Sequence, residues 1–581
     1  MIANRISLMI GGEAGAGITR SGFLFAKACL RGGLHVFGTN DYQSLIRGGR
    51  NFYIARVDAE EIYSQADNID LLLALNKETI LLHKDGLVSG GGIMYDGEEI
   101  ALSSEELGRD DLKLYSVPLK SSVKELEGDL IMRNTVALGA VVALLEYDLE
   151  ILNGVIKDAF EPKVAESNVR AAKMGYDYAR MHFGGDFEYR LVKTSSAGKR
   201  NMFLTGNEAV GLGAIQAGCK FYVAYPMTPA TPLLHFMAPL DREYGMIVIQ
   251  AESEIAAINM VAGASFAGAR AMTATSGGGF CLMSEGLGMT GMTETPAVIM
   301  LAQRPGPSTG LPTYSGQGDL RFAIHASQGE FPRVIIAPGD VEECFYKTME
   351  AFNLAEKFQM PAILITDKYL VESHWTAKLF DRKKIWIDRG LLLTVDEYTG
   401  EEEYRRHKFK EDGISPRATP GMRGAIVRTS ADEHDESGYT TDDPELTAKM
   451  VDKRFKKLDA LVKELENYET TKFYGPEEAD LTVLGWGSTK GSIREAMKLL
   501  GKEGLKINYL QIIYLNPFPV TDVQRILKSA KRTVMVENNK TSQLASLIKE
   551  HCLMTVDYKI LKYNGRPFNP RELSQKIKRV L

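Results

Sequence analysis

The chain has 581 residues, of which 44% are hydrophobic and 25% charged, a composition typical of folded globular domains. Its net charge of −6, without any long block of lysine and arginine, argues against a nucleic-acid partner. The five cysteines form no Cys-X-X-Cys pair, which excludes an iron–sulfur motif of the usual spacing, and the nine histidines show no metal-binding spacing. The first apolar run, Ile6–Ile10, is too short for a signal peptide or a membrane span. We therefore expect a reduced cytoplasmic protein with no membrane partner.

Residues 1–190 have the pattern of an α/β domain. The first strand is expected at 5–10 (RISLMI), and a glycine-rich turn and a helical segment that ends in two glycines follow it. Further strands are predicted at 34–39, 51–57, 70–76 and 91–95, and helices at Met132–Tyr147 and Ala165–His182.

The glycines from Gly11 to Gly17 lie between the first strand and the first helix, where a phosphate-binding loop would lie. They do not match G-x-G-x-x-G in register, which favours a tight turn over a nucleotide site. A second glycine turn, Arg47-Gly48-Gly49, carries a cation that could contact a partner or an anionic ligand.

The rest of the chain divides into three parts. Residues 200–390 alternate strands and helices, which indicates a parallel, doubly wound sheet. Residues 391–474 are charged and rich in turns, and we expect an extended connection there. Residues 475–581 return to the α/β pattern. The predicted fold class is therefore α/β, with three doubly wound domains.

Two proline-rich runs stand out in the second domain, at 225–232 (YPMTPATP) and 304–313 (RPGPSTGLPT). Each follows a β-rich segment, and ligands of open α/β sheets bind beyond the carboxyl ends of strands. Thr228 and Arg304 are the candidates for binding a small carboxylate, because an arginine fork offers two parallel hydrogen bonds and a hydroxyl a third.

Glu254 is the candidate catalytic carboxylate. It directly follows the strand-like segment 246–250 and opens a helix of small residues. A carboxylate at this position is ordinarily a helix-capping group, and Glu252 is a competing carboxylate two residues earlier.

The combination of motifs resembles one family. Residues 205–581 are similar to the α subunit of the 2-oxoacid:ferredoxin oxidoreductases, and residues 1–185 resemble the γ component of that family, fused in front. The runs that carry the resemblance are GGEAGAG, RGG, YPMTPATP, QAESEIAA, ATSGGG, RPGPSTGLPT, DGISPRATPG, DEHDESG, VENN and LKYNGRPF. It implies a Rossmann-like γ domain, a domain of the thiamine-diphosphate pyrimidine-binding type and a transketolase C-terminal-like domain.

The resemblance also implies a reaction. Enzymes of this family decarboxylate a 2-oxoacid, such as pyruvate or 2-oxoglutarate, on thiamine diphosphate. They transfer the acyl group to coenzyme A and pass electrons singly through iron–sulfur clusters to ferredoxin. By motif position, Glu254 would form a hydrogen bond to the aminopyrimidine ring of the cofactor. The other implied site residues are Tyr225, Thr228, Arg304 and Thr309 for the substrate, and Pro226, Met227 and Gly277 for the cofactor.

Two departures and one absence qualify the resemblance. Met227 stands where the family usually has isoleucine, and Ala230 where it has serine, which leaves the substrate open. The Gly-Asp-Gly…Asn-Asn segment that holds the diphosphate through Mg²⁺ is not found, because Asn538-Asn539 follows a different context. We therefore expect a β subunit to bring the diphosphate, Mg²⁺ and a [4Fe-4S] cluster, in an αβ or (αβ)₂ assembly.

Two alternatives remain at this point. A nucleotide-dependent dehydrogenase could use the first glycine loop, or the chain could be an assembly subunit with all chemistry on its partner. The residues that hold coenzyme A are not evident, and the γ-type domain and residues 412–421 are the candidates.

Overall fold

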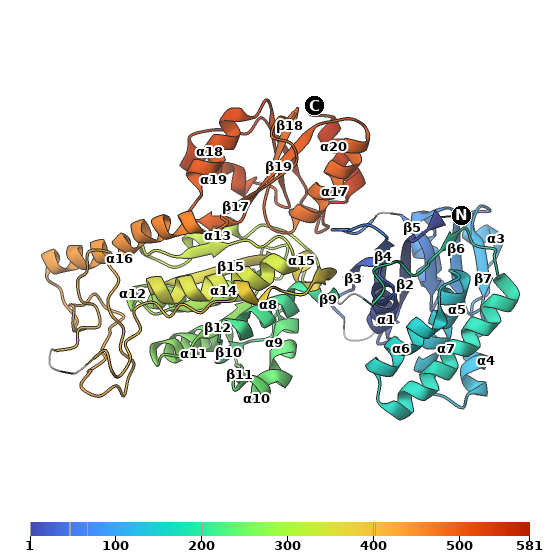
Figure 1. Cartoon of the computed structure of the whole chain (residues 1–581), viewed down its shortest axis with the longest axis horizontal. Helices are drawn as coiled ribbons and strands as arrows, with labels where there is room; N and C mark the ends of the chain where they lie inside the picture. The colour runs from blue at the N-terminus through green and yellow to red at the C-terminus, as the bar shows by residue number, and fades with distance from the viewer. Residues whose placement is uncertain (1, 46–47, 67, 199–200, 399, 401–402) are drawn as a thin grey trace. The chain divides into compact units, whose positions relative to one another are not determined.

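Figure 1 shows a computed structural model of the chain, which describes residues 2–45, 48–66, 68–198, 201–398, 400 and 403–581. Arg47, the cation of the second glycine turn, lies outside these residues. The chain divides into two compact units, and each has sheets covered by helices, so the predicted α/β class is confirmed. The first unit is Met1–Leu204 with Ser373–Leu379 and Asn569–Glu572, and the second is the remainder. Among the described residues, no helix is both long enough and apolar enough to span a membrane.

The N-terminal unit is built on a mixed sheet. Its strands, in order across the sheet, are β7 (Lys113–Ser116), β6 (Leu87–Tyr95), β5 (Ile69–Ala74), β2 (Arg5–Ala14), β4 (Gly48–Asp58), β3 (His35–Asp41), β16 (His374–Lys378) and β9 (Asn201–Thr205). β2, β5, β6 and β7 run parallel, whereas β4 is antiparallel to both β2 and β3. A short pair, β1 (Ile2–Ala3) and β8 (Tyr189–Arg190), lies outside this sheet. The strands predicted at 5–10, 34–39, 51–57, 70–76 and 91–95 are confirmed as β2 to β6.

Two helices of this unit cross at very short range. The helices are α1 (Ile18–Arg31), α2 (Lys77–His83), α3 (Ser104–Leu107), α4 (Leu119–Glu125), α5 (Arg133–Leu144), α6 (Leu149–Ala159) and α7 (Pro162–Phe183), with 3₁₀ turns η1 (Lys84–Gly86) and η2 (Leu130–Met132). A Cβ on Gly139 of α5 would lie 1.9 Å from the carbonyl oxygen of Ala172, and one on Gly175 of α7 would lie 1.8 Å from that of Val136. Glycine is therefore required at both points of the α5–α7 crossing.

The first glycine motif belongs mainly to a strand. β2 continues through Gly11 and Gly12, which pair with Phe52 and Asn51 of β4. A Cβ on Gly11 would lie 2.5 Å from the side chain of Thr79, so close packing accounts for this glycine. Gly17 is the N-cap of α1 with φ 76°, a left-handed conformation that favours glycine. Gly11 and Gly12 therefore give the dehydrogenase alternative no phosphate-binding loop, and only Gly15 and Gly17 lie in the turn before α1.

Each of the two proline-rich runs follows a strand of the larger sheet in the second unit. Its strands, in spatial order, are β11 (Ile247–Gln250), β10 (Phe221–Ala224), β12 (Ala271–Thr275), β13 (Ala297–Gln303), β15 (Pro361–Asp367), β14 (Val334–Ile336) and β20 (Tyr514–Asn516). All neighbours pair in parallel except β14 with β20. β12, β13 and β15 are buried throughout, which explains why their sequences are continuous apolar runs. The helices around the sheet are α8 (Gly206–Gln216), α9 (Thr231–Met237), α10 (Asp241–Tyr244), α11 (Glu254–Phe266), α12 (Gly277–Met292), α13 (Leu320–His325), α14 (Val341–Phe358) and α15 (Lys368–Glu372), with η3 (Ala238–Leu240).

A smaller sheet completes the second unit. It consists of β17 (Thr471–Tyr474), β19 (Ile507–Ile512), β18 (Leu481–Gly485), β21 (Thr533–Glu537) and β22 (Tyr558–Leu561), with α17 (Thr489–Lys502), α18 (Val520–Ser529), α19 (Gln543–Cys552) and α20 (Pro570–Lys578). β17 lies before residue 475, where we expect the third domain to begin, and the domain limits stay predictions. One hydrophobic cluster contains Leu301 and Ile335 of the larger sheet together with Leu484 and Trp486 of the smaller one. The shared core explains why the two sheets form a single compact unit.

Two buried ionic clusters attach the connection at 391–474 to the rest of the second unit. It is irregular up to α16 (Pro444–Glu464), with a 3₁₀ turn, η4 (Arg382–Lys384), before it and another, η5 (Leu465–Asn467), after α16. Glu294, which follows α12, accepts hydrogen bonds from Lys453 at 2.6 Å, from His407 at 3.0 Å, and from Lys457. The side chains of all four are almost completely buried.

The second cluster is centred on Glu356 of α14. Arg270 Nε and Arg417 Nη2 each lie 2.8 Å from a carboxylate oxygen of Glu356, and Arg389 pairs with it as well. Arg417 belongs to the segment 412–421, so part of this segment is buried in the fold, whereas Asp412, Pro420 and Gly421 are exposed.

Candidate functional site

The predicted site residues gather at the carboxyl ends of β10, β11, β12 and β13, the strands drawn in green to yellow in Figure 1. Arg304 follows β13, and Thr228 lies four residues after β10. Arg304 Nη1 donates a hydrogen bond to the carbonyl oxygen of Thr228 at 2.8 Å. The structure thus brings the two residues of the predicted carboxylate site together, although the bond is to the Thr228 backbone. In the described part of the chain, the Thr228 hydroxyl and the other guanidinium N–H groups make no hydrogen bond.

Glu254 is the first residue of α11, and its side chain is only 3% exposed. Helix capping is done by Ser253, whose hydroxyl accepts a hydrogen bond from the backbone N–H of Ala256. Glu254 Oε1 is buried and has no hydrogen-bond partner among the described residues. Because an unpaired buried acceptor costs about 1–3 kcal/mol, it points to a missing donor from a ligand. Glu252, the competing carboxylate, is exposed.

The start of α12 packs closely against Glu254. A Cβ on Gly279 would lie 2.6 Å from Glu254 Oε1 and 2.1 Å from Thr275 Oγ1, so glycine is required at this position. Met227 lies on the same side, since the Thr275 hydroxyl is 3.9 Å from its sulfur. Thr275 belongs to the ATSGGG run that carries the resemblance, although no site role was predicted for it.

Asp319 is a second carboxylate at the site, half-buried, that no sequence motif indicated. A Cβ on Gly277 would lie 2.5 Å from Asp319 Oδ2, and this oxygen is buried without a partner among the described residues. Burial raises the pKa of Asp319 to about 6, and the positive charge of Arg304 opposes this shift. Conversely, burial lowers the pKa of the Arg304 guanidinium, and Asp319 opposes that shift. Asp319 precedes a short helix, so its sequence looks like an ordinary N-cap, yet its side chain makes no capping bond.

Two predicted substrate residues are at the surface. Tyr225 is 39% exposed, and Pro226 beside it is half-buried. Thr309 is exposed in a turn that is closed by a hydrogen bond from Leu311 N–H to the Pro305 carbonyl oxygen. The structure does not bring Thr309 to Arg304 by any hydrogen bond among the described residues, and its role stays a prediction.

The VENN motif supports the site from the smaller sheet. Glu537 accepts hydrogen bonds from the backbone N–H groups of Leu544 and Ala545 at the start of α19. Asn538 and Asn539 bind the backbone and side chain of Gln317, two residues before Asp319. Across the described residues, no group of three His, Cys, Asp or Glu side chains could hold a metal ion.

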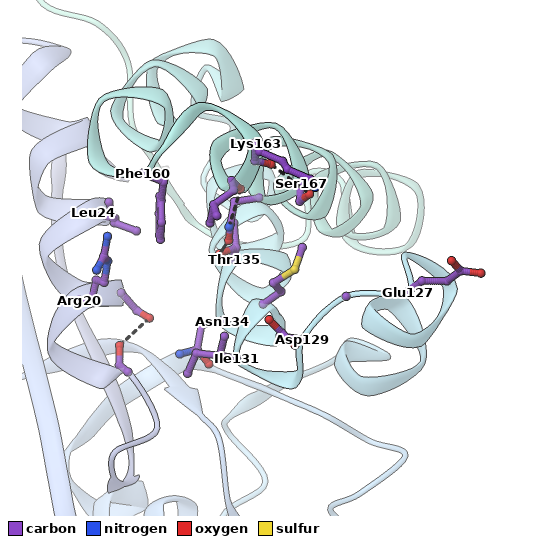
Figure 2. A pocket seen from close by; sticks show the side chains of 16 residues that line it. Arg20, Leu24, Glu127, Asp129, Ile131, Asn134, Thr135, Phe160, Lys163 and Ser167 are labelled. Atoms are coloured by element: carbon purple, nitrogen blue, oxygen red, sulfur yellow. Dashed lines mark hydrogen bonds between the residues drawn. The ribbon is translucent and has the colours of Figure 1, made fainter.

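The N-terminal unit contains a separate pocket of about 490 Å³, shown in Figure 2. It is lined by the first turns of α1 and α7, by the segment before α5, and by Phe160. Asn134 Nδ2 donates to the Ala16 carbonyl oxygen at 2.6 Å, while its Oδ1 is buried and has no partner among the described residues. The Arg20 guanidinium stacks 4.2 Å from the centre of the Phe160 ring, and Lys163 lines the opposite wall. No sequence motif other than Gly17 pointed to this pocket, because its residues come from segments more than 100 positions apart.

Family models match most of the chain. The model described as "Pyruvate flavodoxin/ferredoxin oxidoreductase, thiamine diP-bdg" matches residues 212–453. "Pyruvate ferredoxin/flavodoxin oxidoreductase" matches residues 7–178, and "Pyruvate:ferredoxin oxidoreductase core domain II" matches residues 479–573.

Individual relatives agree with these matches. The chain is 34% identical to 2-oxoacid:ferredoxin oxidoreductase 2, subunit alpha, of Aeropyrum pernix, over 99% of this chain and 98% of the relative. It is also 34% identical to 2-oxoglutarate synthase subunit KorA of Methanothermobacter thermautotrophicus, over 64% of this chain and 97% of the relative. A solved structure of 2-oxoglutarate:ferredoxin oxidoreductase from Magnetococcus marinus, with 2-oxoglutarate, coenzyme A and succinyl-CoA bound, matches with a TM-score of 0.90 and 34% identity, over 99% of both chains. Matches of this extent, together with the geometry at the carboxyl ends of β10 to β13, show that the chain is an oxidoreductase subunit and belongs to the 2-oxoacid:ferredoxin oxidoreductase family, as an α subunit.

Proposed function

We propose that this chain is the γα-fused subunit of an enzyme that converts a 2-oxoacid and coenzyme A to an acyl-CoA and CO₂, with the electrons passed to ferredoxin. The observation that carries the proposal is the pairing of Arg304 with the Thr228 backbone beside the unpartnered carboxylate of Glu254. We propose 2-oxoglutarate as the first substrate to test and pyruvate as the alternative. The Magnetococcus marinus enzyme, described with 2-oxoglutarate bound, supports this order.

The residues around Glu254 fit thiamine diphosphate. A buried Oε1 without a partner suits a ring nitrogen of the aminopyrimidine that carries a proton, and Gly279 lets the first turn of α12 pack against this oxygen. Thiamine diphosphate supplies the nucleophilic carbon and the electron sink for decarboxylation. Glu254 would hold the proton at the aminopyrimidine, while Pro226, Met227 and Gly277 would line its ring.

Arg304 and Thr228 would orient the substrate. The guanidinium donors that remain after the bond to Thr228 can hold the leaving carboxylate, and the Thr228 hydroxyl can add a third donor. Orientation of the substrate by fixed donors lowers the entropic part of the activation barrier. Arg304 can act in this way because its hydrogen bond to the Thr228 backbone fixes its position. Tyr225 and Thr309, at the exposed rim, are proposed to contact the rest of the substrate only in the assembled enzyme.

A β subunit is proposed to cover the exposed side of this site. Ile247 on the edge strand β11, Ile255 on α11 and Leu282 on α12 are 56%, 53% and 51% exposed. Apolar side chains in such numbers beside a half-built site are typical of a protein interface. We propose that β brings the diphosphate, Mg²⁺ and a [4Fe-4S] cluster and transfers electrons to ferredoxin, in an αβ or (αβ)₂ assembly.

The pocket in Figure 2 is proposed to bind the nucleotide end of coenzyme A. Its volume of about 490 Å³ lies in the range of small-molecule sites. Arg20, Lys163 and the N-terminus of α1 offer positive charge to phosphates, Phe160 offers a stacking face, and Asn134 Oδ1 can accept from an amino group. In the alternative segment, 412–421, the cation Arg417 is already paired with Glu356, which supports this choice.

Replacing Arg304 by alanine tests the proposed function. We expect kcat/KM for the 2-oxoacid to fall roughly 10- to 100-fold, which corresponds to losing about 1.5–3 kcal/mol from charge-assisted hydrogen bonds. KM for coenzyme A should not change. Reduction of a viologen dye by the co-purified complex, with either substrate varied, measures both constants.

The control for this variant is Arg242→Ala on α10, an exposed arginine away from the site. It should match the wild type in both constants. An equal rise in KM for both substrates in Arg304→Ala would refute the assignment of the 2-oxoacid to Arg304. Unchanged kinetics would favour the assembly-subunit alternative.

Replacing Lys163 by glutamine tests the coenzyme A pocket. We expect KM for coenzyme A to rise about tenfold, because one charged partner of a phosphate is lost, while KM for the 2-oxoacid stays the same. Lys173→Gln is the matched control, since Lys173 is an exposed lysine on the same helix that does not line the pocket and is paired with Asp177. If both variants behave alike, the pocket does not bind coenzyme A.

A further inference from the structure

Asp319 lies outside the motifs to which the proposed function assigns a role, yet its carboxyl group is held at the site. Its backbone N–H donates to Gln303 Oε1 at 2.9 Å, and Gln303 is the residue directly before Arg304. Gln303 Nε2 donates in turn to the carbonyl oxygen of Thr366 on the neighbouring strand β15. Asp319 is therefore fixed to the same strand end that carries Arg304.

The loop before Asp319 is anchored on its other side as well. Ser315 donates to Asp367 Oδ1 at 3.1 Å, and Gln317 donates to the Trp486 carbonyl oxygen at 2.9 Å and accepts from Asn538 N–H at 2.9 Å. These bonds join the loop to β15 and to the smaller sheet of the same unit. Asp319 is placed by bonds to its backbone and to its neighbours in the loop, yet its Oδ2 is buried without a partner among the described residues. The carboxyl is therefore held for an interaction that the chain alone does not supply.

The surroundings of the carboxyl group are nearly neutral except for one cation. Among the described residues, Arg304 at the end of β13 is the charged group that acts on the Asp319 carboxyl. Burial, and then the charge of Asp319, raise the pKa of the Cys281 thiol on α12. Arg321, two residues further on in α13, pairs with Glu550 instead, and from α19 the neutral Gln543 contacts Gly318. Glu254 lies beyond Gly279, against the same first turn of α12 that Asp319 contacts at Gly277.

We propose that Asp319 is a positioning residue of the 2-oxoacid site, which acts on Arg304 and sets how strongly that guanidinium attracts the substrate carboxylate. The inference rests on the proposed binding of the 2-oxoacid at Arg304. With Asp319 ionised, two carboxylates compete for one half-buried arginine, and binding the substrate places like charges close together. With Asp319 neutral, Arg304 is available to the substrate alone. Substrate binding is therefore linked to the uptake of a proton by Asp319.

The protonation state of Asp319 sets how KM for the 2-oxoacid depends on pH. Because burial raises the pKa of Asp319 to about 6, the carboxyl is neutral below this pH and ionised above it. The carboxylate of a 2-oxoacid is ionised across the whole range. KM for the 2-oxoacid should therefore be lowest below pH 6 and rise above it, whereas KM for coenzyme A should not follow the same curve.

The test compares wild type, Asp319→Asn and Asp452→Asn, each purified with the β subunit. KM for 2-oxoglutarate, pyruvate and coenzyme A is measured by viologen reduction at pH 6, 7 and 8. For the wild type and for Asp452→Asn, an exposed aspartate on α16, we expect KM for the 2-oxoacid to rise about tenfold from pH 6 to 8. For Asp319→Asn we expect a low KM that is flat over this range, because the amide cannot ionise.

A second measurement does not depend on the variant folding. Calorimetric titration of the wild-type complex with the 2-oxoacid at pH 7, in two buffers with different ionisation enthalpies, should show net proton uptake. A flat wild-type KM profile, no proton uptake, or an Asp319→Asn profile that keeps the wild-type slope would each overturn the proposal. A wild-type complex that reduces no viologen with any 2-oxoacid would instead contradict the proposed function itself.

Discussion

Replacing Glu254 by glutamine is expected to lower kcat of the complex with the β subunit by about 100-fold or more, the usual scale for losing a positioned acid–base group. The amide has the same shape as the carboxyl, so it keeps the packing against Gly279 and Thr275. It cannot carry or release a proton at the buried Oε1 position, which has no partner among the described residues. The loss should therefore appear in turnover, and association with β should persist.

Three measurements check this expectation. Turnover is followed by viologen reduction, complex formation by size-exclusion chromatography, and the affinity for thiamine diphosphate by fluorescence titration. Glu252→Gln is the matched control, since Glu252 is an exposed carboxylate two residues earlier on the same approach to α11. Wild-type turnover in Glu254→Gln would show that this residue has only a structural role at the start of the helix.

Replacing Glu294 by glutamine is expected to destabilise the second unit by about 3–5 kcal/mol, the range for removing one partner of a buried ion pair. Glu294 is fully buried and faces Lys453, Lys457 and His407. Burial lowers the pKa of Lys457 to about 7, and Glu294 opposes this shift. Without the carboxylate, the two lysines would be neutral or unpaired in the interior, and α16 would lose its attachment to the end of α12.

Thermal unfolding followed by circular dichroism measures this effect. The control is Glu469→Gln, which breaks the exposed pair between Glu469 and Lys472 and should change stability by no more than about 1 kcal/mol. Equal unfolding temperatures for the two variants would show that the Glu294 cluster is not needed for stability. The catalytic constants measured below the unfolding temperature should be close to wild type, because the cluster lies at the far end of α12 from Gly277.

The sequence was a good guide to the elements and to part of the site. Period-two and period-3.6 patterns depend on neighbouring residues, so the strands from β2 to β6 and the helices α5 and α7 were predictable. The placement of Thr228, Glu254 and Arg304 beyond strand ends followed from one topological rule for parallel sheets. The irregular segment at 391–474 offered no such pattern, because its structure depends on ion pairs with distant residues.

What the sequence by itself determined is the α/β class, the two proline-rich runs at strand ends and Glu254 at the start of a helix. Only the tertiary structure decided that Asp319 lies against Gly277, that Glu294 joins His407 across 113 residues, and that the pocket of Figure 2 exists. The physical reason is the range of the interactions. Local periodicity is set by backbone geometry within one element, whereas buried charges and cavities arise where separate elements pack, and their partners are selected by three-dimensional distance.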